Sequence, residues 1–246
     1  MILKKRLKKL NDKELKEDIK KFIKSSHEFY SSRVPELKIL ANKLHEEHKL
    51  KDFYKIFDKF WASEEPREIS LAIYTLQLYK DEFDINTWRF IKSKIKNLKS
   101  FDKIDALSKN IISEILIKLP QVQDEIISYS KSSNIWLKRC AIMSTISLVK
   151  KGDNKLALKI IENNKNTKNE TLQKANGYVL REIGKNNPEL LKKFISKNID
   201  MPLITFSIAT ENFKDLRRLR EKKISTNTEK IISWRNLGNF SKFFSK

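Results

Sequence analysis

Helical periodicity is the feature of this sequence that most restricts its fold. Apolar residues recur every three or four positions along most of the chain, as they do on one face of an α-helix. No stretch shows the sustained two-residue alternation and hairpin turns that are typical of strands. We therefore expect an all-α protein. The expected helices begin near Pro35, Asp52, Pro66, Phe83, Phe101, Asn134, Asp153, Asn169, Pro188 and Asn212.

Several of these helices have recognisable starts. Pro35, Pro66 and Pro188 stand at first-turn positions, where proline's fixed φ is favourable and its missing N–H is not needed. Ser100 and Asn134 are candidate N-caps, because short polar side chains there accept hydrogen bonds from free backbone N–H groups.

The helices are expected to form pairs that repeat along the chain. Residues 64–76, 100–112, 133–148 and 169–183 resemble the second helix of successive pairs, at steps of about 34 to 42 residues, which is HEAT-like spacing. Such pairs stack into an α-solenoid with a concave groove, because no pair can bury its apolar face alone. We expect one domain over residues 1–223, followed by a C-terminal helix or arm over 224–246.

The charge of the chain indicates the class of partner. Its 246 residues carry 52 Lys and Arg against 31 Asp and Glu, a net charge of +21. So large an excess favours binding to a polyanion or an anionic membrane, and the alternative is a solvated surface in a lysine-rich proteome. The N-terminal segment "MILKKRLKKLNDKELKED" is too charged for a secretory signal, although it could bind a membrane surface as an amphipathic helix. No apolar run approaches the roughly 18 residues of a membrane span, and a cytoplasmic protein is expected.

Several kinds of chemistry do not fit the composition. The single cysteine, Cys140, excludes a disulfide within the chain and a cysteine-based zinc site. His45 and His48 lack the spacing of an H-E-x-x-H zinc motif, and a solvated helix face explains them better. The four glycines form neither of the common phosphate-binding loops, which disfavours nucleotide-dependent reactions of those types.

Two charged residues interrupt apolar helix faces. On a helical wheel of about 100° per residue, Asp105 falls between Ile112 and Leu116 and one turn from Phe101. A carboxylate there must be paired, hydrogen-bonded or open to a groove. Arg139 borders an apolar face in the same way. It could pair with a carboxylate such as Asp105, bind a phosphate from the groove, or do both.

Basic residues gather on one face of the helix expected over residues 169–185. Lys174, Gly177, Tyr178 and Arg181 lie opposite its apolar side, as expected of a surface that a polyanion approaches closely, and a solvated face is the alternative. The glycine suggests that something large needs the space, since glycine in a helix costs about 1 kcal/mol relative to alanine. Other arginines suited to the phosphate backbone are Arg33, Arg217, Arg218 and Arg220.

Five segments together resemble a known family. "RVPELK", "EEPREISLAI", "FDKIDAL", "WLKRCAI" and "KANGYVLRE" occur in the order and spacing of the motifs of AlkD-type DNA alkylation-repair glycosylases, over residues 28–223. The resemblance implies a monomeric superhelix of HEAT-like repeats around duplex DNA. It also implies excision of positively charged N3- and N7-alkylpurines by hydrolysis of the N-glycosidic bond, without a metal or cofactor.

The resemblance also assigns roles to individual residues. Asp105 matches the catalytic carboxylate, Arg139 an arginine near the lesion, and Arg181 an arginine that contacts the DNA backbone. Trp136 begins the segment that holds Arg139 and is expected near the lesion. Phe101 and Tyr178 replace the two tryptophans that flank the lesion, and tryptophan attracts cations more strongly than either. Because some relatives bind branched or distorted DNA without excision, that function is the alternative.

Overall fold

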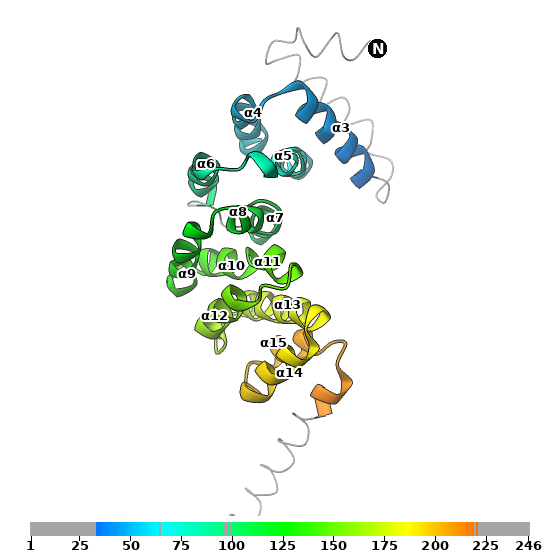
Figure 1. Cartoon of the computed structure of the whole chain (residues 1–246), viewed down its shortest axis with the longest axis vertical. Helices are drawn as coiled ribbons and strands as arrows, with labels where there is room; N and C mark the ends of the chain where they lie inside the picture. The colour runs from blue at the N-terminus through cyan, green and yellow to red at the C-terminus, as the bar shows by residue number, and fades with distance from the viewer. Residues whose placement is uncertain (1–32, 64, 96–97, 99, 219, 221–246) are drawn as a thin grey trace, which may run out of the picture. The chain divides into compact units, whose positions relative to one another are not determined.

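The computed structural model describes residues 33–63, 65–95, 98, 100–218 and 220, and the side chains from residue 37 onward within them (Figure 1). These residues are helical and contain no strand, which confirms the expected all-α fold. The chain divides into two compact units, Met1–Phe90 and Ile91–Lys246. One domain over 1–223 stays a prediction, and the expected extension over 224–246 lies outside the described residues.

The first unit is built from short helices joined by tight turns. Its helices are α3 (Arg33–Glu47), α4 (Leu50–Ala62), α5 (Pro66–Leu78), the 3₁₀ turn η1 (Lys80–Glu82) and the first part of α6 (Ile85–Ile95). Helix α5 packs on both α3 and α4. Pro66 occupies the first turn of α5, as predicted.

The second unit continues the succession of helices. It contains α7 (Phe101–Leu107), the π-helical turn η2 (Ser108–Ile112), α8 (Ser113–Lys118), the 3₁₀ turn η3 (Pro120–Val122), α9 (Gln123–Lys131), α10 (Ile135–Met143), α11 (Ile146–Lys150), α12 (Lys155–Asn164), α13 (Glu170–Asn186), α14 (Pro188–Lys197) and α15 (Leu203–Ala209). Helices α9 and α15 are not among those expected from the sequence. None of the helices in the described ranges is long and apolar enough to cross a bilayer.

The structure shows whether Asn134 and Ser100 cap the first turns of their helices, as predicted. The Asn134 side chain accepts hydrogen bonds from the backbone N–H groups of Trp136, at 2.8 Å, and Leu137, at 3.4 Å, which confirms it as an N-cap. Ser100 occupies the N-cap position of α7, but its side chain accepts no capping hydrogen bond, so that part of the prediction is wrong. Pro188 lies in the first turn of α14, as expected.

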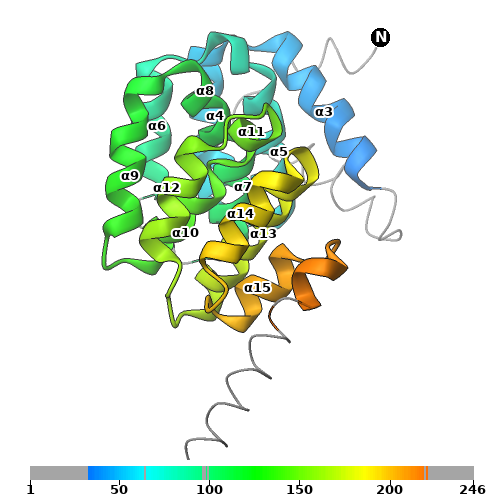
Figure 2. The same cartoon turned by 60° about the horizontal axis from the view of Figure 1, so that its bottom comes forward.

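The helices of the second unit form two layers. Helix α10 packs between α7 and α13, and α13 packs on α15. On the other side, α9 contacts α12, and α14 packs on α13. Both views place α9 and α12 on one side of the unit and α11 and α13 on the other (Figures 1 and 2). The predicted second helices of the pairs at 100–112, 133–148 and 169–183 therefore form one layer, and α15 extends it.

Polar contacts about one repeat apart join neighbouring helices. The Ser113 and Ser147 hydroxyls are 2.6 Å apart and separated by 34 residues. The Thr205 hydroxyl donates to the carbonyl of Gln173 at 3.1 Å, across 32 residues. Buried polar groups need such partners, so these contacts fix the register of successive helices. The first separation equals the shortest predicted step of about 34 residues, and the second is slightly shorter.

A π-helical turn interrupts the run from α7 to α8. A π turn holds one more residue than an α turn, so it leaves a carbonyl without its usual partner. The Asn110 side chain donates to the carbonyl of Ala106 at 2.7 Å. The turn also rotates the residues before it relative to those after it, which a uniform wheel ignores. Phe101 is accordingly 49% exposed, whereas Ile112 and Leu116 are fully buried. A uniform wheel, on which Asp105 falls between Ile112 and Leu116, therefore does not hold across this turn.

Candidate functional site

Asp105 and Arg139 form a two-pronged ion pair between neighbouring helices. The Nε and Nη2 atoms of Arg139, on α10, each donate to one carboxylate oxygen of Asp105, on α7, at 2.7 Å. The two side chains are only 19% and 12% exposed. Charge-assisted hydrogen bonds in this fork geometry are among the strongest in proteins. Of the alternatives that the sequence left open for Arg139, the structure shows the pairing with Asp105, and a phosphate contact stays a prediction.

A third hydrogen bond fixes the arginine further. Its Nη1 atom donates to the backbone carbonyl of Thr171, in the first turn of α13. One guanidinium thus connects α7, α10 and α13. All three of its contacts lie in the layer that holds the predicted second helices, so Asp105 is held in a fixed orientation.

The ion pair lies in the wall of a hollow of about 530 Å³ within the second unit. Five cationic side chains and two carboxylates line it, which makes the hollow strongly electropositive. The lining residues are Asp105, Lys109, Arg139, Met143, Lys174, Ala175, Tyr178, Arg181, Ser207, Ile208, Glu211 and Arg217. The structure thus brings together Asp105, Arg139, Lys174, Tyr178, Arg181 and Arg217 from the predicted site.

Two cations lie against the aromatic ring of Tyr178. The Lys109 Nζ atom is 4.7 Å from the ring centroid, and the Arg181 Cζ atom is 5.2 Å from it. The same ammonium lies 3.5 Å from Asp105 Oδ2. Lys109 is not among the residues predicted from the sequence, although its position four residues after Asp105 is a usable signal for a helical ion pair.

Two more aromatic rings lie beside the ion pair. The ring of Phe101 is 5.9 Å from that of Trp136, centroid to centroid, and tilted by 32°. The guanidinium carbon of Arg139 is also 5.9 Å from the Phe101 ring. Neither ring lines the hollow itself. Arg139 therefore lies between the exposed Phe101 ring, against which the half-buried Trp136 packs, and the electropositive hollow.

Residues 3–213 match the model of a protein family described as DNA alkylation repair enzymes. The chain belongs to this family. A predicted DNA alkylation repair enzyme from Enterococcus faecalis has the same fold, with a TM-score of 0.64, 18% identity, and coverage of 74% of this chain and 86% of that one. AlkD2 from Streptococcus mutans is similar as well, with a TM-score of 0.56, 20% identity, and coverage of 74% and 90%. No curated protein matches the chain.

In this alkylation-repair protein, three more of the predicted basic residues have partners within the chain: Arg181, Arg217 and Lys174. Arg181 forms an ion pair with Glu211 across the hollow. The Arg217 guanidinium donates to the carbonyls of Thr210, at 3.1 Å, and Glu211, at 3.0 Å, beyond the end of α15. Lys174 pairs with Glu170 at 2.6 Å.

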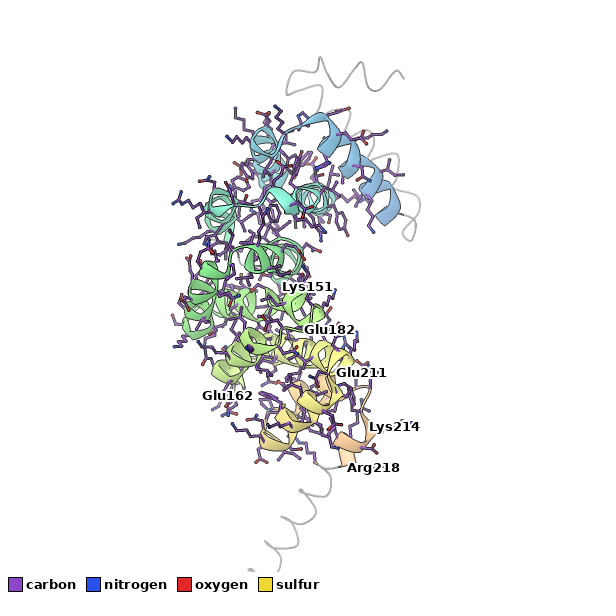
Figure 3. All side chains as sticks on the ribbon, in the orientation of Figure 1. Lys151, Glu162, Glu182, Glu211, Lys214 and Arg218 are labelled. Carbon is purple, nitrogen blue, oxygen red and sulfur yellow. The ribbon has the colours of Figure 1, made fainter. Side chains whose placement is uncertain are left out.

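Three predicted arginines lie outside the hollow or outside the described residues. The Arg220 guanidinium donates to the carbonyl of Met201 at 3.0 Å and lies 4.8 Å from the Phe206 ring, so it packs against α15. Arg218 is 72% exposed and lies 3.9 Å from the carboxylate of Asp215. Figure 3 places Arg218 and Glu211 along the same edge of this unit. The side chain of Arg33 lies outside the described residues.

Gly177 faces the neighbouring helix α15. A Cβ atom added there would lie 2.7 Å from the Cβ of Ile208 and 2.9 Å from the carbonyl oxygen of Thr205. Both contacts are too short for real atoms, so the glycine allows α13 and α15 to pack closely. The interpretation that Gly177 makes room for a ligand is therefore wrong, because the neighbouring helix fills that space.

No three histidine, cysteine, aspartate or glutamate side chains gather into a possible metal site within the part of the chain that the structure describes. Cys140 is fully buried, and this burial raises the pKa of its thiol to about 12. The reactive thiolate is therefore disfavoured, and Cys140 acts as a small apolar residue of the core.

Proposed function

We propose that this protein is a DNA N-glycosylase that releases positively charged N3- or N7-alkylated purines from duplex DNA. The observation that carries the proposal is the position of Asp105, a carboxylate held in the wall of an electropositive hollow. Membership of the alkylation-repair family supports DNA as the substrate. A soluble monomer in the cytoplasm remains part of the proposal.

The reaction needs little chemistry from the protein. An alkylated purine with a fixed positive charge is already a good leaving group. When the bond from C1′ to the base nitrogen breaks, its electron pair goes to the purine, which leaves neutral, and the positive charge moves to the sugar. A nearby carboxylate stabilises this oxocarbenium-like state and orients a water molecule for attack at C1′. We assign that role to Asp105.

Arg139 orients the carboxylate in this proposal. A carboxylate has about four acceptor positions, and the fork of Arg139 uses two of them. The remaining positions can accept from water. Since the guanidinium also bonds to the Thr171 carbonyl, it cannot leave without breaking contacts with two other helices. We therefore expect Arg139 to serve mainly in positioning, although it also lines the hollow.

The DNA backbone would contact the cations around the hollow. Lys174, Arg181 and Arg217 all line it, and their summed field attracts phosphates independently of base sequence. Arg218 is exposed on the same unit and could bind a phosphate further along. Phe101 presents exposed ring surface beside the hollow, and the half-buried Trp136 packs against it, so this ring could contact the DNA next to the damaged nucleoside.

A non-catalytic protein that binds branched or distorted DNA is the second candidate. The observation that favours it is the neutralisation of Asp105 by two cations, the Arg139 fork at 2.7 Å and the Lys109 ammonium at 3.5 Å. A carboxylate offset in this way stabilises a cationic sugar less than an isolated carboxylate would. Such a protein would bind DNA without releasing a base.

The deciding experiment measures purine release from methylated duplex DNA under single-turnover conditions. We expect the Asp105→Asn variant to lose roughly 10²- to 10³-fold in rate, since it removes the charge but keeps the shape. The matched control is Asp102→Asn, which makes the same change on the exposed side of the same helix and should react like wild type. Equal rates for Asp105→Asn and wild type would remove Asp105 from the mechanism. No release by wild type, with DNA still bound, would favour the second candidate.

A further inference from the structure

The ammonium of Lys109 lies between the two groups that a cationic base would seek. Its Nζ atom is 3.5 Å from Asp105 Oδ2 and 4.7 Å from the centroid of the Tyr178 ring. A carboxylate and an electron-rich ring face are the two surfaces to which an organic cation binds best. The protein therefore already holds a cation of its own in the position where the charge of a methylated purine would be stabilised.

The π turn determines this position. Lys109 is the second residue of η2, and one side chain within the turn and one directly after it bond to backbone carbonyls of this segment. Asn110 donates to the carbonyl of Ala106, and the Ser113 hydroxyl donates to the carbonyl of Lys109 itself, both at 2.7 Å. The backbone that carries Lys109 is thus held by hydrogen bonds, whereas the side chain beyond it is not. Such π turns are frequent at functional sites.

Lys109 is the most easily displaced of the cations around Asp105 and Tyr178. Arg139 is held by two hydrogen bonds to Asp105 and a third to Thr171. Arg181 is paired with Glu211. The Lys109 ammonium makes one loose ionic contact, and its side chain is 31% exposed on a flexible stem. A nearby phosphate of bound DNA could draw it away at little cost.

We propose that Lys109 determines how strongly the site prefers a cationic base over a neutral one. Its ammonium competes with the charge of the base for Asp105 and Tyr178, and it must move before a cationic base can contact either group. A neutral base gains little from that displacement. This inference rests on the proposed function, because it assumes that the damaged nucleoside reaches the hollow.

The test compares the affinity of each variant for two duplexes of the same sequence. One carries a central N7-methylguanine on a 2′-fluorinated sugar, which keeps the positive charge but resists release of the base. The other carries unmodified guanine. Anisotropy titrations give two Kd values, and their ratio, unmodified over methylated, reports the preference for the cation. Weak contacts with the phosphate backbone affect both duplexes and cancel in the ratio.

We expect Lys109→Met to raise this ratio roughly 3- to 10-fold, the effect of removing one like charge close to the base. The affinity for each duplex should fall at the same time, because a possible phosphate contact is lost. Lys109→Arg keeps the charge and should keep the wild-type ratio. Lys174→Met is the matched control. It removes another lysine of the hollow, paired instead with Glu170, and should weaken binding of both duplexes equally.

The outcomes separate this inference from the proposed function. An unchanged or lower ratio for Lys109→Met, with both duplexes bound, overturns the role of Lys109 but leaves glycosylase activity open. An equal increase for Lys174→Met also overturns it, since any lost charge would then have the same effect. Failure of wild type to bind either duplex overturns the proposed function itself. If Lys109→Met does not fold, as judged by circular dichroism, Lys109→Gln serves in its place with the same expected ratio.

Discussion

Gly177 gives the sharpest test of how the hollow is built. In most helices, replacing glycine by alanine stabilises the chain by about 1 kcal/mol, because alanine restricts the unfolded state and favours the helix. Here the added methyl group would meet the Ile208 Cβ at 2.7 Å and the Thr205 carbonyl oxygen at 2.9 Å. We therefore predict that Gly177→Ala destabilises the protein.

The size of the destabilisation depends on which atoms can move to relieve the clash. The carbonyl of Thr205 belongs to the backbone of α15, and the hydroxyl of the same residue is bonded to the Gln173 carbonyl of α13 at 3.1 Å. Relief of the clash thus requires the two helices to separate. Overpacking of this kind costs about 1 to 3 kcal/mol or slightly more, against the gain of about 1 kcal/mol in helix propensity. Since backbone atoms must move, the cost should lie in the upper part of that range, and we expect a net loss of about 1 to 2 kcal/mol, or about 2 to 8 °C in Tm.

Thermal and urea unfolding followed by circular dichroism measure this loss. Gly184→Ala is the matched control, since it makes the same substitution in the same helix. There the new methyl would meet side-chain atoms, Leu191 Cδ2 at 2.5 Å and the ring of Phe213 at 2.8 Å. Side chains can rotate away more easily than a backbone carbonyl, so the cost should be smaller. If Gly177→Ala is as stable as wild type, or if both variants lose equally, the reasoning is refuted.

Three further predictions concern charge and burial. Glu211→Gln should raise the affinity for duplex DNA about 2- to 5-fold in a filter-binding titration, since an exposed ion pair on Arg181 is worth up to about 1 kcal/mol; unchanged affinity would mean that Arg181 binds no phosphate. Arg218→Gln should lower the slope of log Kd against log salt by about one contact without changing Tm, and an unaltered slope would move the DNA path elsewhere. Cys140 should react with iodoacetamide at pH 8 roughly 1,000-fold more slowly in the native chain than in urea. Burial raises the pKa of Cys140 to about 12, whereas the unfolded thiol has a pKa of about 8.5. The buried neutral thiol therefore contributes fully to stability below about pH 8.5, and this contribution is lost as the pH rises toward 12. A steep alkaline decline that persists unchanged in Cys140→Ala would contradict this.

The sequence predicted the repeat but not all of its members. The apolar periodicity and the proline starts located α5, α7, α10, α13 and α14, because these signals are local. Helix α15 was missed. Its seven residues follow Pro202 and begin with an exposed Leu203, so no clear amphipathic pattern marks it. It is stabilised mainly by packing on α13, which no local pattern encodes.

Some features of the candidate site could likewise be inferred from local sequence signals, whereas others depend on tertiary packing. The ion pair of Asp105 with Arg139 could be inferred from two charges in apolar faces one repeat apart. The π turn could not be inferred, since nothing in "SKNII" distinguishes it from an α turn, and a uniform wheel therefore misplaced Asp105 relative to Ile112 and Leu116. The positions of Lys109 and Glu211 in the hollow also depend on how the helices are rotated and stacked. Those are properties of the tertiary packing.

The extra residue in the π turn makes this segment sensitive to changes in length. Deleting one residue between 108 and 112 would allow a continuous α-helix and would require no new loop. The deletion would nevertheless rotate Phe101 and Asp105 by about 100° relative to α8. The Asp105 carboxylate would then no longer reach the Arg139 guanidinium. A homologous chain that is one residue shorter or longer here would need its acid at another position or would lack this ion pair. Alignments across this segment should therefore be anchored on the geometry of the ion pair between the acid and the arginine.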